Sequence, residues 1–252
     1  MWKKILIAVV AIAVVAGVGL FIADRTLFAP TAVTTAVPVA PTIAAPTQAP
    51  TQASAAAAPT QAAQPTAPAA ATGTAMLYRI DAAQSEAGYE VGETFFQDNR
   101  FATAIGRTSA IAGDVLVDFA QPANSQLGTL VIDISQLTSD ETRRDNYIRN
   151  NGLESSTYPQ ATFKPTRIEG LPASAKPGDQ LTFKVTGDLT VKETTKPVTF
   201  DVTLKTDGDK LTGAATTEIL MSEFGVGPIQ LAFLQTEDKM KLFINFVALP
   251  AQ

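Results

Sequence analysis

The side chains of this sequence that could take part in a reaction are serines, carboxylates and arginines, because the sequence contains no histidine and no cysteine. That composition excludes disulfides, Cys/His zinc sites, cysteine nucleophiles and histidine general bases. The serines stand in no G-x-S-x-G nucleophile elbow, and the sequence has neither a phosphate-binding loop nor an acidic calcium loop. We therefore expect a protein that is not an enzyme and that holds no metal and no cofactor.

One charged cluster could still bind a ligand. Arg143, Arg144 and Asp145 lie within residues 139–150, which predict a short helix because Ser139 or Asp140 can cap its start and an Asn-Gly pair can end it. The cluster could form a polar gate at a binding site. The alternative is a solvated helix face with local ion pairs, which contribute little to stability. Two residues on the other side of the helix would face the binding site as a lid: Tyr147 and Ile148.

The elements that would position such a site are strands. In residues 181–191 and 198–206, apolar and polar residues alternate. The segment GDLTVKETTKPVTFD, residues 187–201, contains the end of the first run, the connection and the start of the second run. This alternation predicts antiparallel strands with one polar and one apolar face. Many strands with one short helix indicate an all-β sandwich or closed barrel, and we expect an antiparallel barrel of about eight strands. Similar patterns occupy residues 87–91, 101–108, 111–119, 127–134, 161–168, 210–219 and 240–248.

The interior of this barrel is predicted to be apolar. Most of the 13 phenylalanines of the chain fall in residues 76–252. A barrel of about eight strands is wide enough either to be filled by side chains or to hold one small ligand. Two interpretations therefore stay open. The barrel either encloses a channel for an apolar ligand or is a filled module that binds proteins or serves a structural role.

Residues 1–28 predict a membrane anchor. Lys3 and Lys4 precede an uncharged run of 19 residues, from Ile5 to Ala23, which is close to the ~20 residues that span a bilayer core. The basic start places the N-terminus in the cytoplasm and the rest of the chain outside the cell membrane, as a single-pass protein. A cleaved signal peptide with a site near Ala29 is the alternative.

Residues 29–75 predict a disordered linker, because they carry no charge and consist mainly of Ala, Thr and Pro. Residues 76–252 predict the folded domain. Its 16 basic and 23 acidic residues give a formal charge of −7. An acidic surface without a basic stripe argues against nucleic acid, or anionic lipid headgroups, as a docking partner.

The motifs of this domain, in their order and spacing, resemble the YceI-like family of lipid- or polyisoprenoid-binding proteins over nearly the whole of residues 76–252. The segments that carry the resemblance are Tyr78-Arg79-Ile80-Asp81 with Ser85, Gly113-Asp114-Val115, Ile132 to Ser135, Tyr158 to Phe163, Gly187 to Val191 with Thr195 to Val198, and Phe224 to Gly227. The sequence departs from the family pattern at Gln84, at Gly152 to Ser155, at Glu193 and at Met221 to Glu223. The departures at Gly152 to Ser155 and at Met221 to Glu223 fall near the helix and the turn that would form the barrel mouth.

The resemblance implies an extended, lipocalin-like barrel outside the cytoplasm, with an apolar channel for a long-chain isoprenoid or similar amphiphilic lipid. The polar gate would then contact a lipid headgroup. The sequence leaves the oligomeric state open. The residues that we expect to bind the ligand are Phe101, Phe119, Ile132, Tyr147, Ile148, Phe163, Phe183, Val185, Leu189, Phe200, Val202, Phe224, Leu242 and Ile244.

Overall fold

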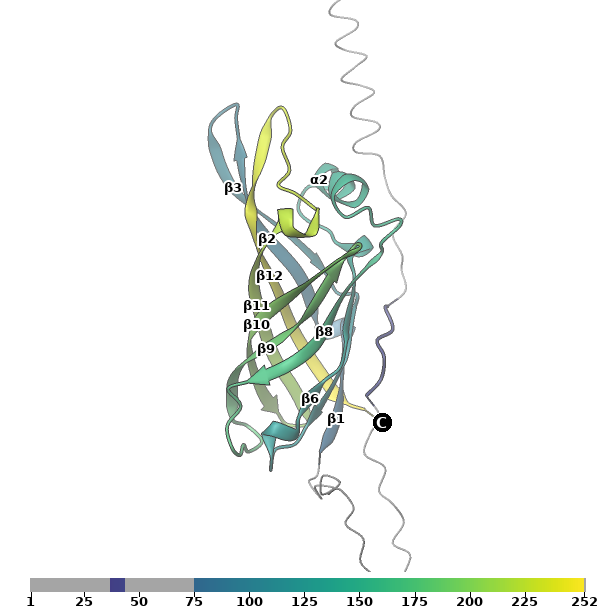
Figure 1. Ribbon diagram of the computed structural model, residues 1–252, viewed down its shortest axis with the longest axis vertical. Coiled ribbons are helices and arrows are strands. Elements are labelled where there is room, and N and C mark those ends of the chain that lie inside the picture. The colour runs from purple at the N-terminus through teal and green to yellow at the C-terminus, as the bar shows by residue number, and fades with distance from the viewer. Residues whose placement is uncertain (1–36, 44–74, 252) are drawn as a thin grey trace, which may run out of the picture.

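The computed structural model describes residues 37–43 and 75–251. Residues 75–251 form a strongly curled, twelve-stranded sheet with one short α-helix, α2 (Figure 1). Every pair of neighbouring strands is antiparallel. The strands are β1 Met76–Ile80, β2 Glu86–Phe95, β3 Arg100–Thr108, β4 Ile111–Ala112, β5 Asp114–Val117, β6 Gln126–Leu127, β7 Leu130–Asp133, β8 Gln160–Glu169, β9 Gln180–Val191, β10 Thr194–Asp207, β11 Lys210–Leu220 and β12 Leu234–Pro250.

The longest strand, β12, pairs with the first strand, β1, and so joins the start of the folded domain to its end. It pairs with β11 along one edge, and with β2 and then β1 along the other. On the far side of the sheet, β4 follows β3 after two residues and pairs with β7. An isolated bridge between Arg107 of β3 and Thr138 also joins the two sides. The sheet therefore curls round an interior, and we call it the barrel.

The predicted all-β antiparallel fold with one short helix is confirmed, but the strands are more numerous than eight. The predicted strand over residues 111–119 is divided into β4 and β5, and the one over residues 127–134 into β6 and β7. Gly113 lies at the first division, where an added Cβ would fall 2.4 Å from the Cδ2 atom of Leu130. The close approach of these segments at Gly113 accompanies the break.

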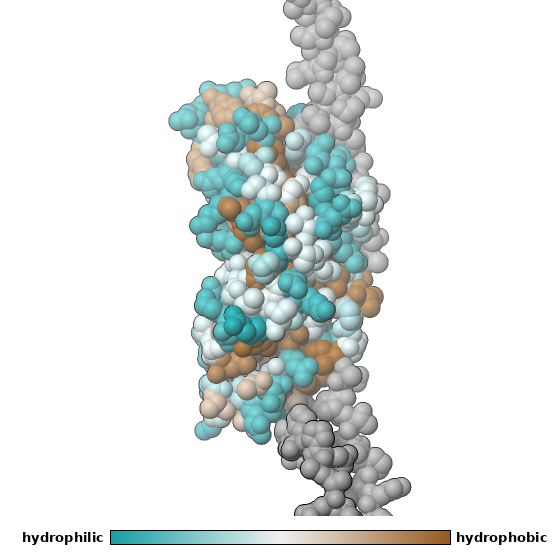
Figure 2. All heavy atoms as spheres, viewed as in Figure 1, coloured by the Kyte–Doolittle hydropathy of each residue, from teal (hydrophilic) through white to brown (hydrophobic). Residues whose placement is uncertain are grey.

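The strand alternation sorts residues between the two faces of the sheet as the period of two requires. On β10, Val198, Phe200 and Val202 are buried, whereas Thr199 and Asp201 between them are exposed. The outer face seen in Figure 2 is mostly hydrophilic or neutral in hydropathy. The apolar core therefore lies inside the barrel.

The helix starts later than the sequence predicts. Helix α2 covers Thr142–Tyr147 and continues into a π-helical segment, Ile148–Gly152. The prediction that Ser139 or Asp140 caps it is wrong, because the Glu141 side chain accepts the hydrogen bond from the Arg143 N–H. The Ser139 hydroxyl instead donates to Asp145, at 2.6 Å. Figure 1 shows α2 at the end of the barrel where β2 and β3 are joined, which we call the upper end.

The predicted anchor, residues 1–28, and most of the predicted linker lie outside the described residues. In residues 37–43 and 75–251, no helix combines the length and the hydropathy needed to cross a bilayer. Residues 37–43 are extended without helix or strand and run along the barrel wall (Figure 1). The backbone N–H of Ile43 donates to Asp114 of β5 at 3.3 Å, so part of the predicted linker contacts the domain.

Candidate ligand-binding site

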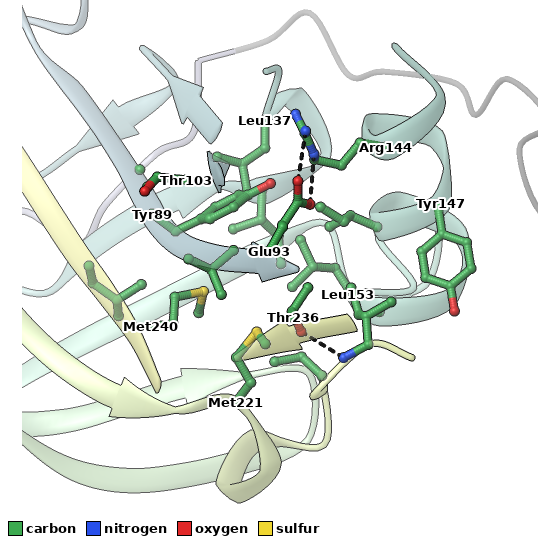
Figure 3. A pocket seen from close by; sticks show the side chains of 18 of the residues that line it. Tyr89, Glu93, Thr103, Leu137, Arg144, Tyr147, Leu153, Met221, Thr236 and Met240 are labelled. Atoms are coloured by element: carbon green, nitrogen blue, oxygen red, sulfur yellow. Dashed lines mark hydrogen bonds and ion pairs between the residues drawn. The ribbon is translucent and has the colours of Figure 1, made fainter. Parts of the chain in front are cut away.

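The upper half of the barrel is hollow. A cavity of about 1240 Å³ lies between the strands and α2, and we call it the upper cavity (Figure 3). Its volume is that of a binding site for a small molecule or larger, since such sites typically occupy ~300–1,000 Å³. Its lining extends to Gln97, Arg100 and Phe233, which are exposed at the upper end. The cavity is therefore accessible from solvent at that end.

Alternate residues of the long strands supply the apolar walls. On β12, Met240, Leu242 and Ile244 follow one another at a spacing of two and line the cavity. The same spacing on β2 brings in Tyr89 and Val91. Further apolar lining comes from β7 to β11, from the 3-10 turn Met221–Phe224 and from the helical segment. Such a surface can bind a hydrocarbon chain, because removing apolar area from water is favourable.

A buried ion pair lies in the wall near α2. The guanidinium of Arg144 donates from Nε to Glu93 Oε1 and from Nη2 to Glu93 Oε2, each at 3.0 Å. Glu93 continues the inward face of β2 after Tyr89 and Val91, and only 3% of it is exposed. Figure 3 shows the two side chains meeting between β2 and α2. The pair places a polar group at one side of an otherwise apolar cavity.

Arg144 also holds the segment before α2. Its Nη1 atom donates to the Ser139 hydroxyl at 3.1 Å and to Asp140 Oδ1 at 2.5 Å. Burial lowers the pKa of Arg144, but the hydrogen bonds to Glu93 and Asp140 outweigh it, so the pKa is raised overall. The hydrogen bond from Arg144 to Asp140 lowers the pKa of the exposed Asp140 carboxyl. Arg144 therefore stays charged and fixes α2 against β2.

Tyr89 lies on the same inward face of β2 as Glu93. We count it with Glu93 and Arg144 as the polar group of the upper cavity. Its ring packs over Gly106 of β3, where an added Cβ would fall 2.2 Å from the Cε1 atom of the tyrosine. Burial raises the pKa of the Tyr89 hydroxyl, and the negative charge of Asp145 raises it further. The hydroxyl is therefore neutral over the physiological range and can donate a hydrogen bond into the cavity.

Most of the residues predicted to bind a ligand do line cavities in the barrel interior. Those at the upper cavity are Ile132, Tyr147, Ile148, Phe163, Leu189, Phe200, Phe224, Leu242 and Ile244. A second group lines a smaller cavity of about 80 Å³ in the lower half, and its members are Phe119, Phe183, Val185 and Val202. We call this the lower cavity. A ligand-contacting role for any of these residues stays a prediction.

Phe101 is the exception among the predicted residues. It is 59% exposed and lines neither cavity. On β3, Ala104 is buried and Ala102 lines the upper cavity, so the alternation turns Phe101 to the outside. The prediction that Phe101 lies at the site is corrected accordingly.

The predicted charged cluster is divided by the structure. Arg143 and Arg144 line the upper cavity, as a polar gate would require. Asp145 is buried instead, where it accepts hydrogen bonds from the N–H and the hydroxyl of Ser139. It therefore stabilises the approach to α2. Glu93 was missed, although Tyr89, Val91 and Glu93 share one strand face, and a charge on that apolar face was the available signal.

Comparisons with known proteins agree on one family. The family model described as the YceI-like domain matches residues 78–248. Protein YceI from Escherichia coli O6:H1 is 35% identical over 98 residues, which are 38% of this chain and 47% of the relative. A UPF0312 protein from Pseudomonas putida is 32% identical over 124 residues, which are 46% of this chain and 60% of the relative. The matches thus span only about half the length of these curated relatives.

Two solved structures share the fold. The crystal structure of Burkholderia cenocepacia BcnA has a TM-score of 0.54 at 24% identity, and the match covers 67% of this chain and 98% of that one. A polyisoprenoid binding domain from Saccharophagus degradans has a TM-score of 0.51 at 12% identity, with 70% and 99% covered. At these identities the likeness shows the fold alone.

Proposed function

The chain belongs to the family of YceI-like domains, and from that premise we propose that it is a binding protein that holds a long-chain isoprenoid, or a similar amphiphilic lipid, in its upper cavity. The observation that carries the proposal is the volume of about 1240 Å³ behind apolar walls, with an entrance at the upper end. The structurally similar domain from Saccharophagus degradans is described as polyisoprenoid binding, which supports the same class of ligand.

The walls favour a ligand that is mostly hydrocarbon. Burial of a chain yields about 0.8 kcal/mol per CH₂ in gross terms, so the length of the chain outweighs any single polar contact. The polar group of Glu93, Arg144 and Tyr89 would face the headgroup. Because Arg144 already neutralises Glu93 through two hydrogen bonds, the group offers oriented dipoles and the Tyr89 hydroxyl in place of an unpaired charge.

We also propose that the protein is not an enzyme. The titratable residues that line the upper cavity include Glu93 and Arg144, and these are joined to each other. An acid whose two oxygens both accept from a guanidinium is poorly placed to act as a general base. The described residues contain no group of three or more His, Cys, Asp or Glu side chains arranged to hold a metal ion.

We further propose that residues 1–28 hold the domain at the outer side of the cytoplasmic membrane, with residues 29–75 as a tether. The uncharged run of 19 residues behind Lys3 and Lys4 supports this position. The alternative is a filled barrel that acts as an interaction module. It is favoured only by the lower half of the barrel, where the lower cavity has a volume of about 80 Å³. The hollow upper half favours ligand binding.

The test is to purify the full-length protein from cells that make polyprenols and to identify the extracted lipid by mass spectrometry. The expected result is an isoprenoid or a related amphiphile in a fixed ratio to protein. Repeated preparations without lipid, combined with no binding of added isoprenoids, would overturn the proposal and favour the interaction module.

A further inference from the structure

Two phenylalanine rings form the floor of the upper cavity. Phe163 of β8 and Phe200 of β10 contact each other edge to face, with ring centroids 5.0 Å apart and an angle of 74° between the rings. Both line the upper cavity, and they are 2% and 5% exposed. Ile244 of β12 lies at the same level, because it lines the upper and the lower cavity.

The boundary between the two cavities falls between successive inward side chains of β9 and of β10. On β10, Phe200 lines the upper cavity, whereas Val202, the next inward residue, lines the lower one. On β9, Leu189 lines the upper cavity and Val185 the lower one. The floor is therefore a layer of side chains across the barrel.

Gly187 makes the position of the Phe163 ring possible. It lies between Val185 and Leu189 on the inward face of β9, where this strand passes from one cavity to the other. An added Cβ would fall 2.7 Å from Cζ of Phe163 and 2.5 Å from the backbone oxygen of Lys164. Real Cβ atoms do not approach other atoms so closely, so any side chain at residue 187 would displace the ring. A glycine here lets Phe163 reach across to Phe200.

We propose that the Phe163–Phe200 pair, seated over Gly187, limits the length of the hydrocarbon chain that this protein accepts. The proposal rests on the proposed function, because it assumes that the chain enters the upper cavity from the upper end. A chain that reaches the floor cannot continue into the lower cavity, since the two rings contact each other and close packing leaves no free path between them. Further isoprene units would remain outside the barrel.

The affinity for a prenol should therefore rise with the length of its chain only up to a limit. Each isoprene unit that enters the cavity should lower the Kd about tenfold. This factor follows from the binding free energy that each non-hydrogen atom of a larger ligand typically contributes. Once the chain touches the floor, an added unit stays in water and leaves the Kd unchanged. The length at which the gain ends measures the distance from the entrance to Phe163 and Phe200.

The experiment is equilibrium dialysis of the purified full-length protein with radiolabelled geraniol, farnesol, geranylgeraniol and longer all-trans prenols. In the wild type, the gain in affinity should end within this series. In Phe163→Leu and Phe200→Leu, the limit should move by at least one isoprene unit, so that prenols beyond the original limit bind about tenfold more tightly than to the wild type. Phe246→Leu is the matched control, because Phe246 lines only the lower cavity. Its limit should stay that of the wild type.

The outcomes separate this proposal from the proposed function. If the wild type binds no prenol of any length, both fail. If prenols bind but affinity rises through the longest member of the series, the floor does not limit length, and this result needs no variant. If the limit exists but is the same in folded Phe163→Leu and Phe200→Leu as in the wild type, another part of the cavity sets it. Circular dichroism checks that each variant is folded.

Discussion

The Arg144 guanidinium and the Glu93 carboxylate face each other in parallel, with both hydrogen bonds at 3.0 Å, between α2 and β2. The side chain of Glu93 is 4% exposed and that of Arg144 is 18% exposed. A doubly hydrogen-bonded pair of this kind has a fixed geometry. It therefore attaches the helical cover of the upper cavity to the strand that lines it.

Removing one partner of this pair should destabilise the protein. Arg144→Ala leaves the Glu93 carboxylate buried without its counter-charge, and we expect a loss of about 3 kcal/mol in the free energy of unfolding. Chemical denaturation followed by circular dichroism measures it. Arg167→Ala is the control, because both side chains of the Arg167–Glu169 pair are about half exposed or more, and the loss of this pair should cost less than about 1 kcal/mol. Equal costs for the two variants would show that burial of the Glu93–Arg144 pair has no special effect.

Stability should fall at alkaline pH, and Tyr89 should contribute to the fall. Burial raises the Tyr89 pKa above its ordinary value, so the folded protein holds this proton more tightly than the unfolded chain. The contribution to stability is complete below the unfolded tyrosine pKa of about 10, and it is lost as the pH rises above that value. Tyr89→Phe keeps the ring and removes the titration. Its unfolding free energy should decline less steeply above that pH, as urea denaturation at a series of pH values would show. An unchanged slope would contradict the burial of an ionisable hydroxyl at this position.

A methyl group at residue 187 should be costly. Gly187→Ala forces a Cβ to within 2.7 Å of Phe163 Cζ, and overpacking of this kind typically costs about 1–3 kcal/mol. At Gly152 an added Cβ would meet only the Val226 oxygen, at 3.5 Å, which is an ordinary contact. Gly152→Ala should therefore be close to neutral. Thermal unfolding of the two variants compares the sites.

A double variant separates the ring from the backbone as the cause. If the clash with the Phe163 ring dominates, Phe163→Leu should cost less in the Gly187→Ala background than in the wild type, and the interaction energy should exceed about 0.5 kcal/mol. Additive effects would instead assign the cost to the Lys164 backbone oxygen, which lies 2.5 Å from the added Cβ.

The sequence predicted which strand residues face the interior, because a strand has a simple period. Once residues 181–191 and 198–206 are strands, Leu189, Phe200 and their neighbours at a spacing of two must face one side together. The same rule placed Phe163 inside. The period cannot tell which side faces in when both carry apolar residues, and this is why Phe101 was misplaced beside the small Ala102 and Ala104.

The shape of the barrel interior could not be predicted from the sequence. An inward Phe200 can pack against another ring or line a cavity, and the choice depends on how far the sheet curls. The structure gives it both roles, because Phe200 contacts Phe163 and lines the upper cavity. The partner of Arg144 could not be identified either, since Glu93 is 51 residues away in the sequence. The sequence posed a choice between a channel and a filled barrel, and the structure has a hollow upper half above a packed lower half.

A buried charge should have different effects in these two halves. Met240 is half-buried and lines the upper cavity, where a carboxylate can point into open space and keep water around it. We expect Met240→Glu to remain folded and to lose bound lipid, because a charge in the wall disfavours a hydrocarbon chain. Val202 is 7% exposed and belongs to the packed lower half, so Val202→Glu should unfold the protein, since an isolated buried charge costs several kcal/mol. Circular dichroism and mass spectrometry of the extracted lipid measure both properties for each variant. If Met240→Glu retained lipid as the wild type does, the hydrocarbon chain of the ligand would not lie against this wall. If Met240→Glu unfolded as Val202→Glu is expected to, the upper half of the barrel would be packed as tightly as the lower half.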